Sequence, residues 1–265
     1  MPARLPLLEV VGPRGTRIPV QCIVKPHQEK MVLNVGALGP RLAVPPKTPP
    51  QQALAFVEHH ARWLEAQYLH SRQHAVPLEM GKPFKLPLLG VPTPVSWQAA
   101  DFPKLIERKG ELVLAVPAGM GAVRRAHALL RTHLEQTIRA FVATEMGPYV
   151  TALKRSPTSV LITPLQNLWG YMTPRDRMAL DLGLALTPES VLRYVLVHEL
   201  CHMLERNHQT PFWRLVGQLM PTFRDQEAWL KRNGAQAKTL MATVLGLSVD
   251  AFNGEQDGVD AGDDI

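Results

Sequence analysis

The chain has 265 residues, of which 46% are hydrophobic, so it can bury a sizeable core and one compact domain is the default expectation. Its two cysteines, Cys22 and Cys201, lie far apart and exclude both a disulfide framework and an all-cysteine metal site. The amino-terminal residues lack the pattern of a signal peptide, and no apolar run approaches the roughly 18 residues that span a bilayer. We therefore expect a cytoplasmic protein that is neither exported nor inserted into a membrane.

The net charge of +6 is unevenly distributed along the chain. Five of the 23 acidic residues lie among the last twelve positions, which leaves 29 basic and 18 acidic residues in the rest of the chain. A basic body attracts polyanions, so a nucleic acid or a nucleotide is a candidate partner that the acidic tail would shield. Solubility without a specific polyanionic partner explains the same charge equally simply.

Strand-like runs open the chain. Three short runs with strand composition are Ile18–Val24, Met31–Val35 and Arg41–Val44. The turn-prone residues 25–30 predict that the first two runs form a hairpin. Helical spacing from Gln51 to about His74 then predicts a helix on this sheet. Its two terminal histidines, His70 and His74, are four residues apart without an acid at ligand spacing, and we interpret them as part of a solvated face.

A second β-rich region follows, and it leads into a long helix. Its strand-like runs are residues 82–90, Val91–Trp97 and Glu111–Val116. Helical periodicity from Val123 to Met146 predicts the helix, and Gly147-Pro148 is a stop signal. This stop marks the expected seam between a β-rich part and a catalytic part. We detect no internal sequence repeat.

Large hydrophobic residues alternate with small or acidic ones from Met178 to Leu186, which predicts a half-exposed strand. Thr187-Pro188 has the composition of a helix start. The last clear helix is expected to end at Asn233-Gly234.

The helix that begins near residue 188 contains the sequence HELCH. His198 and His202 are four residues apart, so both imidazoles project from one face of a helix and can bind one ion. Glu199 points in a different direction, which suits a carboxylate that contacts a metal-activated water rather than the metal. Buried histidines satisfied by hydrogen bonds are the alternative that needs no metal.

A catalytic zinc ion needs three protein ligands and one open position, so a third ligand is required. His208 follows His202 by six residues and can reach the ion if the helix ends near Glu205 and the chain turns back. Glu227, on a later helix, is the alternative third ligand, since some zinc hydrolases use two histidines and a distant glutamate.

The segment HELCHMLERNHQTPFWRLVGQLMPTFRDQEAWLKRN closely resembles the YgjP-like zinc metallopeptidase family, distant relatives of the SprT-like proteases. The element LWG, residues 168–170, is similar to an arginine-tryptophan-glycine element of that family, with Leu168 in place of the arginine. Residues 178–190 resemble the family's strand before its active-site helix. The resemblance implies that His198, His202 and His208 bind zinc and that Glu199 is the catalytic base.

We therefore predict an α+β fold, a zincin-like metallopeptidase with a β-rich amino-terminal region and a helical carboxy-terminal catalytic region that carries HExxH. The predicted boundaries are an extension at residues 1–17, a metallopeptidase domain at 18–234 and a second extension at 235–265 that ends in a tail expected to be disordered. Within the domain, the β-rich part covers about 18–147 and the catalytic part about 148–234.

The predicted activity is that of a zinc metallopeptidase, in which a zinc-activated water attacks a peptide carbonyl and Glu199 is the general base. We expect a peptide or protein substrate to pair with an exposed strand edge, for which Met178–Leu186 is the candidate. Tyr171 and Arg175 are candidates for stabilising the oxyanion. The alternatives are a zinc-dependent nucleotide or phosphoester hydrolase and a noncatalytic zinc-containing module that binds nucleic acid. No membrane partner is expected.

Overall fold

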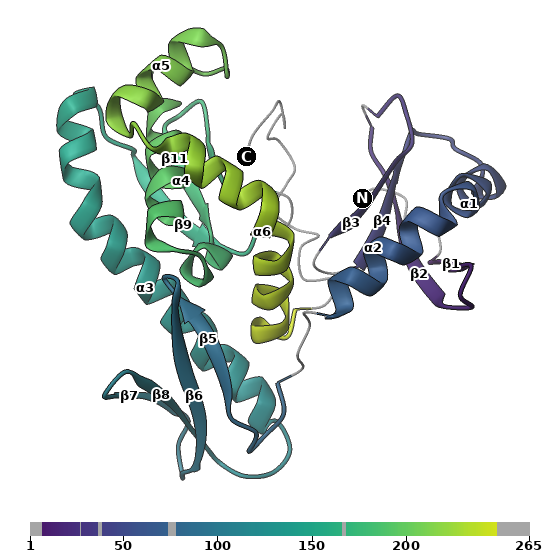
Figure 1. Ribbon diagram of the computed structural model, residues 1–265, viewed down its shortest axis with the longest axis horizontal. Coiled ribbons are helices and arrows are strands. Elements are labelled where there is room, and N and C mark those ends of the chain that lie inside the picture. Colours follow the sequence, from purple (N-terminus) through teal and green to yellow (C-terminus); the bar gives the residue numbers. More distant parts are fainter. Residues whose placement is uncertain (1–6, 27, 37–38, 74–77, 166–167, 248–265) are drawn as a thin grey trace. The chain divides into compact units, whose positions relative to one another are not determined.

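The computed structural model describes residues 7–26, 28–36, 39–73, 78–165 and 168–247. It divides the chain into two units, residues 1–76 and residues 77–265 (Figure 1). The first eight strands, all before residue 117, form two four-stranded sheets, one in each unit, and helices make up most of the chain that follows. The predicted mixed α+β class is therefore confirmed. Among the described residues, no helix combines the length and the apolar character needed to cross a bilayer.

The amino-terminal unit is a four-stranded sheet with two helices. Its elements are β1 (Leu8–Val11), β2 (Arg17–Val24), β3 (Val32–Gly36), β4 (Gly39–Val44), α1 (Pro50–His59) and α2 (Ala61–Gln73). The strand order is β1-β2-β4-β3, with β2 and β4 parallel and each outer strand antiparallel to its neighbour. Buried side chains of the sheet and of both helices share one apolar core. Strand β1 lies within the segment that the sequence suggested was an extension.

The hairpin predicted between the first two strand-like runs is wrong. Strand β2 pairs with β1 and with β4, and β3 pairs only with β4 in the described sheet. The buried carboxylate of Glu65 accepts hydrogen bonds from the backbone N–H groups of Arg14 and Thr16, in the turn between β1 and β2. This contact from a distant helix stabilises the β1–β2 turn. A prediction made from the composition of the strands and the turn alone does not take it into account.

The single helix predicted from Gln51 to about His74 is two helices, α1 and α2. The break lies at His60. Its backbone N–H donates to the carbonyl oxygen of Val57, three residues earlier, and so tightens the last turn of α1. The imidazole Nδ1 of His60 also lies 2.8 Å from the carbonyl oxygen of Phe56.

The second unit begins with a sheet that repeats the topology of the first. Its strands are β5 (Phe84–Leu88), β6 (Val91–Ala99), β7 (Lys104–Arg108) and β8 (Glu111–Val116). The order is β5-β6-β8-β7, again with parallel central strands and antiparallel outer strands, and a helix again follows the fourth strand. The sequence predicts no repeat, so the two units repeat in topology rather than in detectable sequence. Strand β7 was missed because its sequence, KLIER, is mostly polar or exposed.

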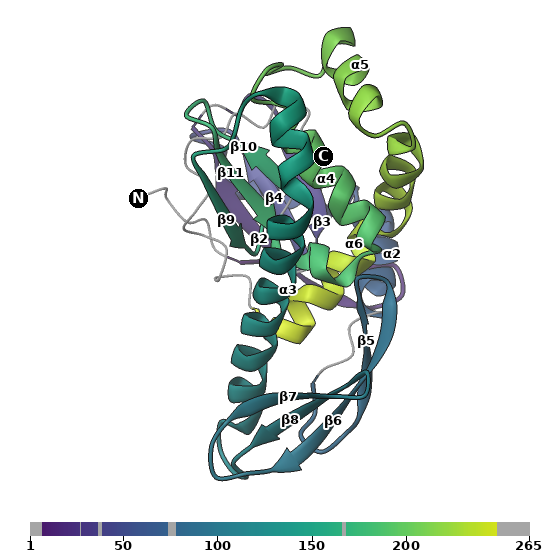
Figure 2. The same ribbon diagram turned by 90° about the vertical axis from the view of Figure 1, so that its left-hand side faces the viewer.

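Helix α3 (Ala122–Leu153) contacts both sheets of this unit (Figure 2). The stop predicted at Gly147-Pro148 is wrong, because the helix continues through Pro148. An internal proline removes one hydrogen bond and is unfavourable by about 3 kcal/mol in isolation. Burial of the following residues favours continuation, since Tyr149 packs against the core and Leu153 is buried.

A three-stranded sheet follows α3 along the chain and precedes the last three helices. It consists of β9 (Ser159–Thr163), β10 (Gly170–Met172) and β11 (Arg177–Asp181), in the order β10-β11-β9. The predicted half-exposed strand at Met178–Leu186 is wrong, because β11 is the buried central strand and Leu182–Leu186 is a buried 3₁₀ helix, η1. The Asp181 carboxylate accepts a hydrogen bond from the N–H of Gly183 and so begins that helix.

Three helices complete the fold: α4 (Glu189–Cys201), α5 (Thr210–Leu219) and α6 (Phe223–Leu245). Helix α4 begins where Thr187-Pro188 indicated. The end predicted for the last helix at Asn233-Gly234 is wrong, since α6 continues to Leu245. Gly234 lies against the indole ring of Trp169, where an added Cβ would be 3.3 Å from Cζ2. The glycine therefore allows close packing inside the helix and does not end it.

Candidate metal centre

Helix α4 places two polar side chains in the core. His198 is fully buried and Glu199 is 1% exposed, among apolar neighbours from the same helix. The helix ends at Cys201, four residues before the expected end near Glu205. His202 nevertheless keeps helical dihedrals, so its imidazole lies one turn beyond that of His198. The two Nε2 atoms are 3.2 Å apart.

His208 completes the group from a different segment. It lies before α5, and its Nε2 is 2.9 Å from Nε2 of His198. The indole Nε1 of Trp213 donates to the carbonyl oxygen of His208 over 3.0 Å, which holds the backbone of this residue. The ligand atoms of His198, His202 and His208 all lie within 4.8 Å of one another, as the spacing of the sequence predicts.

The spacing of the three imidazole nitrogens suits a bound metal ion. Imidazole nitrogens that bind one tetrahedral ion at about 2.0–2.1 Å lie about 3.3 Å apart, close to the separations of 3.2 and 2.9 Å in this cluster. Nδ1 of His202 lies 3.0 Å from the carbonyl oxygen of Glu205, so Nδ1 carries the proton and Nε2 offers a lone pair to the cluster.

The protonation states fit a metal ion as well. Burial lowers the pKa of His198 well below 6.5, and the nearby His202 and His208 lower it further. Burial also lowers the pKa of His202 to about 4. Both imidazoles are therefore neutral at pH 7, which is the form that binds a metal.

Phe212, the third residue of α5, forms an apolar wall beside the three imidazoles. Its ring centroid lies 4.8, 4.5 and 4.7 Å from those of His198, His202 and His208, respectively. This fully buried ring keeps water away from one side of the ligands.

Glu199 is held against strand β10. A Cβ atom at Gly170 would lie 2.7 Å from Oε1 of Glu199 and 2.8 Å from its Cγ, so only glycine leaves room for this side chain. The carboxylate is not one of the three clustered ligands. Burial and, to a smaller extent, the charge of Glu199 raise the pKa of Cys201 to about 12, so this thiol is protonated at pH 7.

Glu227, the alternative third ligand, is not part of the three-histidine group. It lies in α6 and forms an ion pair with Lys231 over 2.5 Å. Its charge and that of Glu199 raise the pKa of the buried Tyr194, although burial itself is the larger cause.

A buried ion pair lies next to the residues that precede β10. Nζ of Lys238 is 2.9 Å from Oδ1 of Asp181, and it also donates to the carbonyl oxygens of Leu165 and Leu168. The ammonium group lies 4.2 Å from the centroid of the Trp169 ring. These contacts hold the carbonyl groups of Leu165 and Leu168, and Leu168 lies two residues before Gly170, beside Glu199.

Asp181, Lys238 and Gly170 were not predicted to shape the site. A signal for Lys238 was available, since it continues the apolar stripe of α6 four residues after Gly234 and eight after Leu230. The LWG element was noted only through its resemblance to the family.

The other described histidines have structural partners. Nδ1 of His127 lies 2.6 Å from the carbonyl oxygen of Val244, and His133 lies 3.4 Å from a carboxylate oxygen of Glu107. The side chain of His70 and the whole of His74 lie outside the described residues.

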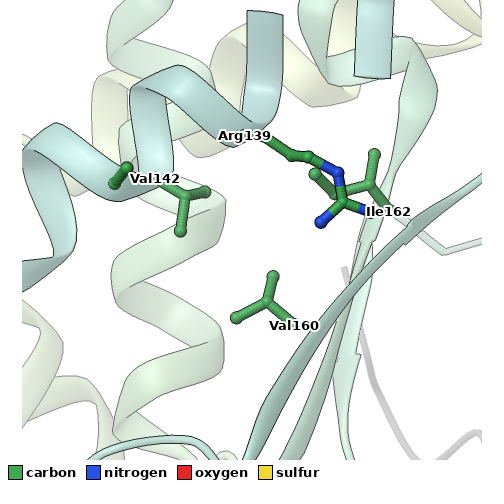
Figure 3. A pocket seen from close by; sticks show the side chains of 5 residues that line it. Arg139, Val142, Val160 and Ile162 are labelled. Carbon is green, nitrogen blue, oxygen red and sulfur yellow. The ribbon is translucent and has the colours of Figure 1, made fainter. Parts of the chain in front are cut away.

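A shallow pocket between α3 and β9 is separate from the histidines (Figure 3). It is lined by Arg139, Val142, Ala143, Val160 and Ile162. The only charged group of this lining, the guanidinium of Arg139, pairs with Glu135 on the same helix. The pocket therefore contributes no catalytic group.

Comparison with known proteins agrees with this chemistry. Residues 29–233 match the protein-family model described as YgjP-like, metallopeptidase domain. No curated protein and no solved structure matches the chain.

Proposed function

The chain belongs to the YgjP-like metallopeptidase domain family, because the match covers more than half of it, and from this we propose that it is a zinc metallopeptidase. The observation that supports this proposal most directly is the convergence of the Nε2 atoms of His198, His202 and His208 beside the buried carboxylate of Glu199. Three imidazoles and one open position are typical of catalytic zinc.

A bound zinc ion would supply Lewis-acid chemistry, since it lowers the pKa of a water molecule and polarises a carbonyl oxygen. Glu199 would take the proton of the attacking water and deliver it to the amine that leaves the cleaved peptide bond. The Glu199 carboxylate is 1% exposed, so solvent screens its charge little at the place where it would take the proton. Gly170 would keep Glu199 in the required position.

Strand β10 is the better candidate for aligning a peptide than Met178–Leu186. It is an outer strand of the described sheet, contacts α4, and begins at Gly170 beside Glu199. A peptide that adds to this edge would pass next to the catalytic carboxylate. Side chains alternate along a strand, so Tyr171 points to the face opposite Glu199, which does not favour it as the oxyanion donor.

The test compares zinc-loaded wild type with Glu199→Gln and His202→Ala on a peptide library derived from a whole proteome. We expect wild type to cleave peptides, Glu199→Gln to keep zinc and lose turnover, and His202→Ala to lose zinc. Equal cleavage by Glu199→Gln would contradict the role of the carboxylate.

Parallel incubations with nucleoside triphosphates and with duplex DNA distinguish the alternatives. Hydrolysis of triphosphates without cleavage of peptides would indicate a phosphoester hydrolase. A salt-dependent shift of DNA by both wild type and Glu199→Gln, without hydrolysis, would indicate a binding module.

A further inference from the structure

The third histidine of the metal centre lies on a segment that is not helical. Helix α4 ends at Cys201 and α5 begins at Thr210, and residues 202–208 connect the second ligand to the third. Ligands of a metal site need precise placement, which irregular backbone does not provide by itself. The N–H groups of residues 203–205 bond carbonyl oxygens of Leu200 and Cys201, and Trp213 bonds His208, so further contacts must place the residues between these two points.

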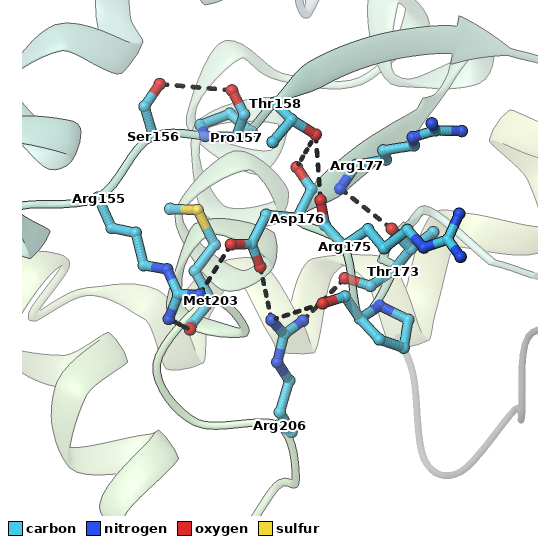
Figure 4. A network of polar contacts seen from close by, with 11 residues as sticks. Arg155, Ser156, Pro157, Thr158, Thr173, Arg175, Asp176, Arg177, Met203 and Arg206 are labelled. Atoms are coloured by element: carbon cyan, nitrogen blue, oxygen red, sulfur yellow. Dashed lines mark hydrogen bonds and ion pairs between the residues drawn. The ribbon is translucent and has the colours of Figure 1, made fainter.

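Asp176 joins this segment to two other parts of the fold (Figure 4). Its Oδ1 is 2.5 Å from the guanidinium of Arg206, which belongs to the segment, and its Oδ2 is 2.9 Å from the guanidinium of Arg155, which follows α3. Arg155 also donates to the carbonyl oxygen of Met203 over 2.6 Å, and Arg206 to that of Thr173 over 2.8 Å. The segment between the two ligands is thus held at residues 203 and 206.

The carboxylate is itself rigidly placed. Asp176 lies in the turn between β10 and β11, where its N–H donates to the carbonyl oxygen of Thr173. Its own carbonyl oxygen accepts the N–H of Thr158 over 2.7 Å. Its φ of 56° is in the left-handed region, which aspartate and asparagine tolerate better than most residues.

The Asp176 contacts differ from an ordinary surface ion pair. The side chain is only 13% exposed, and each of its two oxygens bonds a different guanidinium. Charge-assisted hydrogen bonds of this kind are roughly twice as strong as neutral ones. Without the negative charge, the side chains of Arg155 and Arg206 would repel each other at the place where they must meet.

We propose that Asp176 is a positioning residue of the metal centre: through Arg155 and Arg206 it holds residues 202–208 so that His208 reaches the ion bound by His198 and His202. The inference rests on the three-histidine centre of the proposed function but not on the identity of the substrate.

The variant that tests this is Asp176→Asn, which keeps the size of the side chain and tolerates the left-handed backbone while it removes the charge. We expect its affinity for zinc, measured by competition with a chromophoric chelator, to fall by about 10–100-fold. The matched control is Glu135→Gln, which removes the charge from an exposed pair with Arg139. Its affinity should stay within about two-fold of wild type.

A second measurement excludes a general loss of stability. In the metal-free protein, hydrogen exchange of the backbone amides in residues 202–208 should be faster in Asp176→Asn than in wild type, and exchange in α6 should be unchanged. Arg206→Gln should lower zinc affinity as well, and the loss in the double variant should be smaller than the sum of the two single losses, because both changes break the Asp176–Arg206 contact.

Unchanged zinc affinity in Asp176→Asn, additive losses in the double variant, or faster exchange throughout α6 would each overturn the proposal. A wild-type protein that binds zinc tightly and cleaves no peptide would instead refute the peptidase and leave the role of Asp176 standing. The exchange measurement needs no metal, so it decides the role of Asp176 even if zinc does not bind.

Discussion

Gly170→Ala places a methyl group where the carboxylate of Glu199 lies. The added Cβ would be 2.7 Å from Oε1 and 2.8 Å from Cγ of Glu199, and 3.0 Å from the carbonyl oxygen of Ala179. Non-bonded heavy atoms prefer about 3.5–4.0 Å, so the glutamate must move by roughly 1 Å. A displacement of that size at a reacting group lowers the rate by about 100-fold, or about 2.7 kcal/mol in the activation barrier.

The assay for Gly170→Ala is steady-state cleavage of the best peptide found for wild type, together with the zinc content of the same sample. We expect kcat to fall about 100-fold while one zinc ion per chain is retained, since the three atoms nearest to the new methyl group belong to Glu199 and Ala179 and not to the histidines. Gly147→Ala is the matched control, because a Cβ there would have no neighbour within 4 Å and kcat should not change. Wild-type kcat in Gly170→Ala would refute the placement of Glu199 as the base beside β10.

Three further predictions concern the surroundings of the site. Lys238→Met leaves the buried Asp181 carboxylate without its cation, and urea unfolding should show a loss of about 3–5 kcal/mol, whereas a loss below about 1 kcal/mol would contradict a buried pair. Burial lowers the pKa of His202 to about 4, below the value of about 6.5 in the unfolded chain, so the folded state binds fewer protons between these values. The stability of chelator-treated protein should therefore fall by about 3 kcal/mol from this group as the pH drops from about 6.5 to about 4, a contribution that urea titrations of His202→Gln should lack. Trp213→Phe removes the hydrogen bond to the carbonyl oxygen of His208 and should weaken zinc binding about five-fold in chelator competition, whereas unchanged affinity would show that this bond does not hold the ligand.

The cluster of three histidines was predictable because most of its geometry is local. Four residues of helix bring His198 and His202 together wherever such a helix forms. The position of His208 required only that the chain reverse within six residues, which it does. The contacts that secure this reversal were not predictable, because Arg206 bonds Asp176 across 30 positions of sequence.

The pairing of strands was less accessible from the sequence. Strand composition located β2, β3 and β4, but the contact between Glu65 and the β1–β2 turn joins residues about 50 positions apart. The alternation at Met178–Leu186 has the period of a half-exposed strand, yet its small residues let other elements approach closely. An added Cβ at Gly183, for example, would lie 3.3 Å from Sδ of Met241.

The predicted ends of two helices were wrong for a related reason. Proline and glycine are stop signals in isolated helices, and at Pro148 and Gly234 burial of the following turns overrides them. Lys238 lies beyond the helix end expected at Gly234, so the apolar stripe that continues to Lys238 was not assigned to a helix and the buried pair with Asp181 was missed. Tertiary contacts decided each of these cases.

X-ray absorption at the zinc K edge tests the central claim most directly. For the zinc-loaded protein we predict three imidazole nitrogens and one oxygen at about 2.0–2.1 Å from the metal. A spectrum with fewer than three imidazoles, or with a sulfur ligand at about 2.3 Å, would contradict a centre built from His198, His202 and His208.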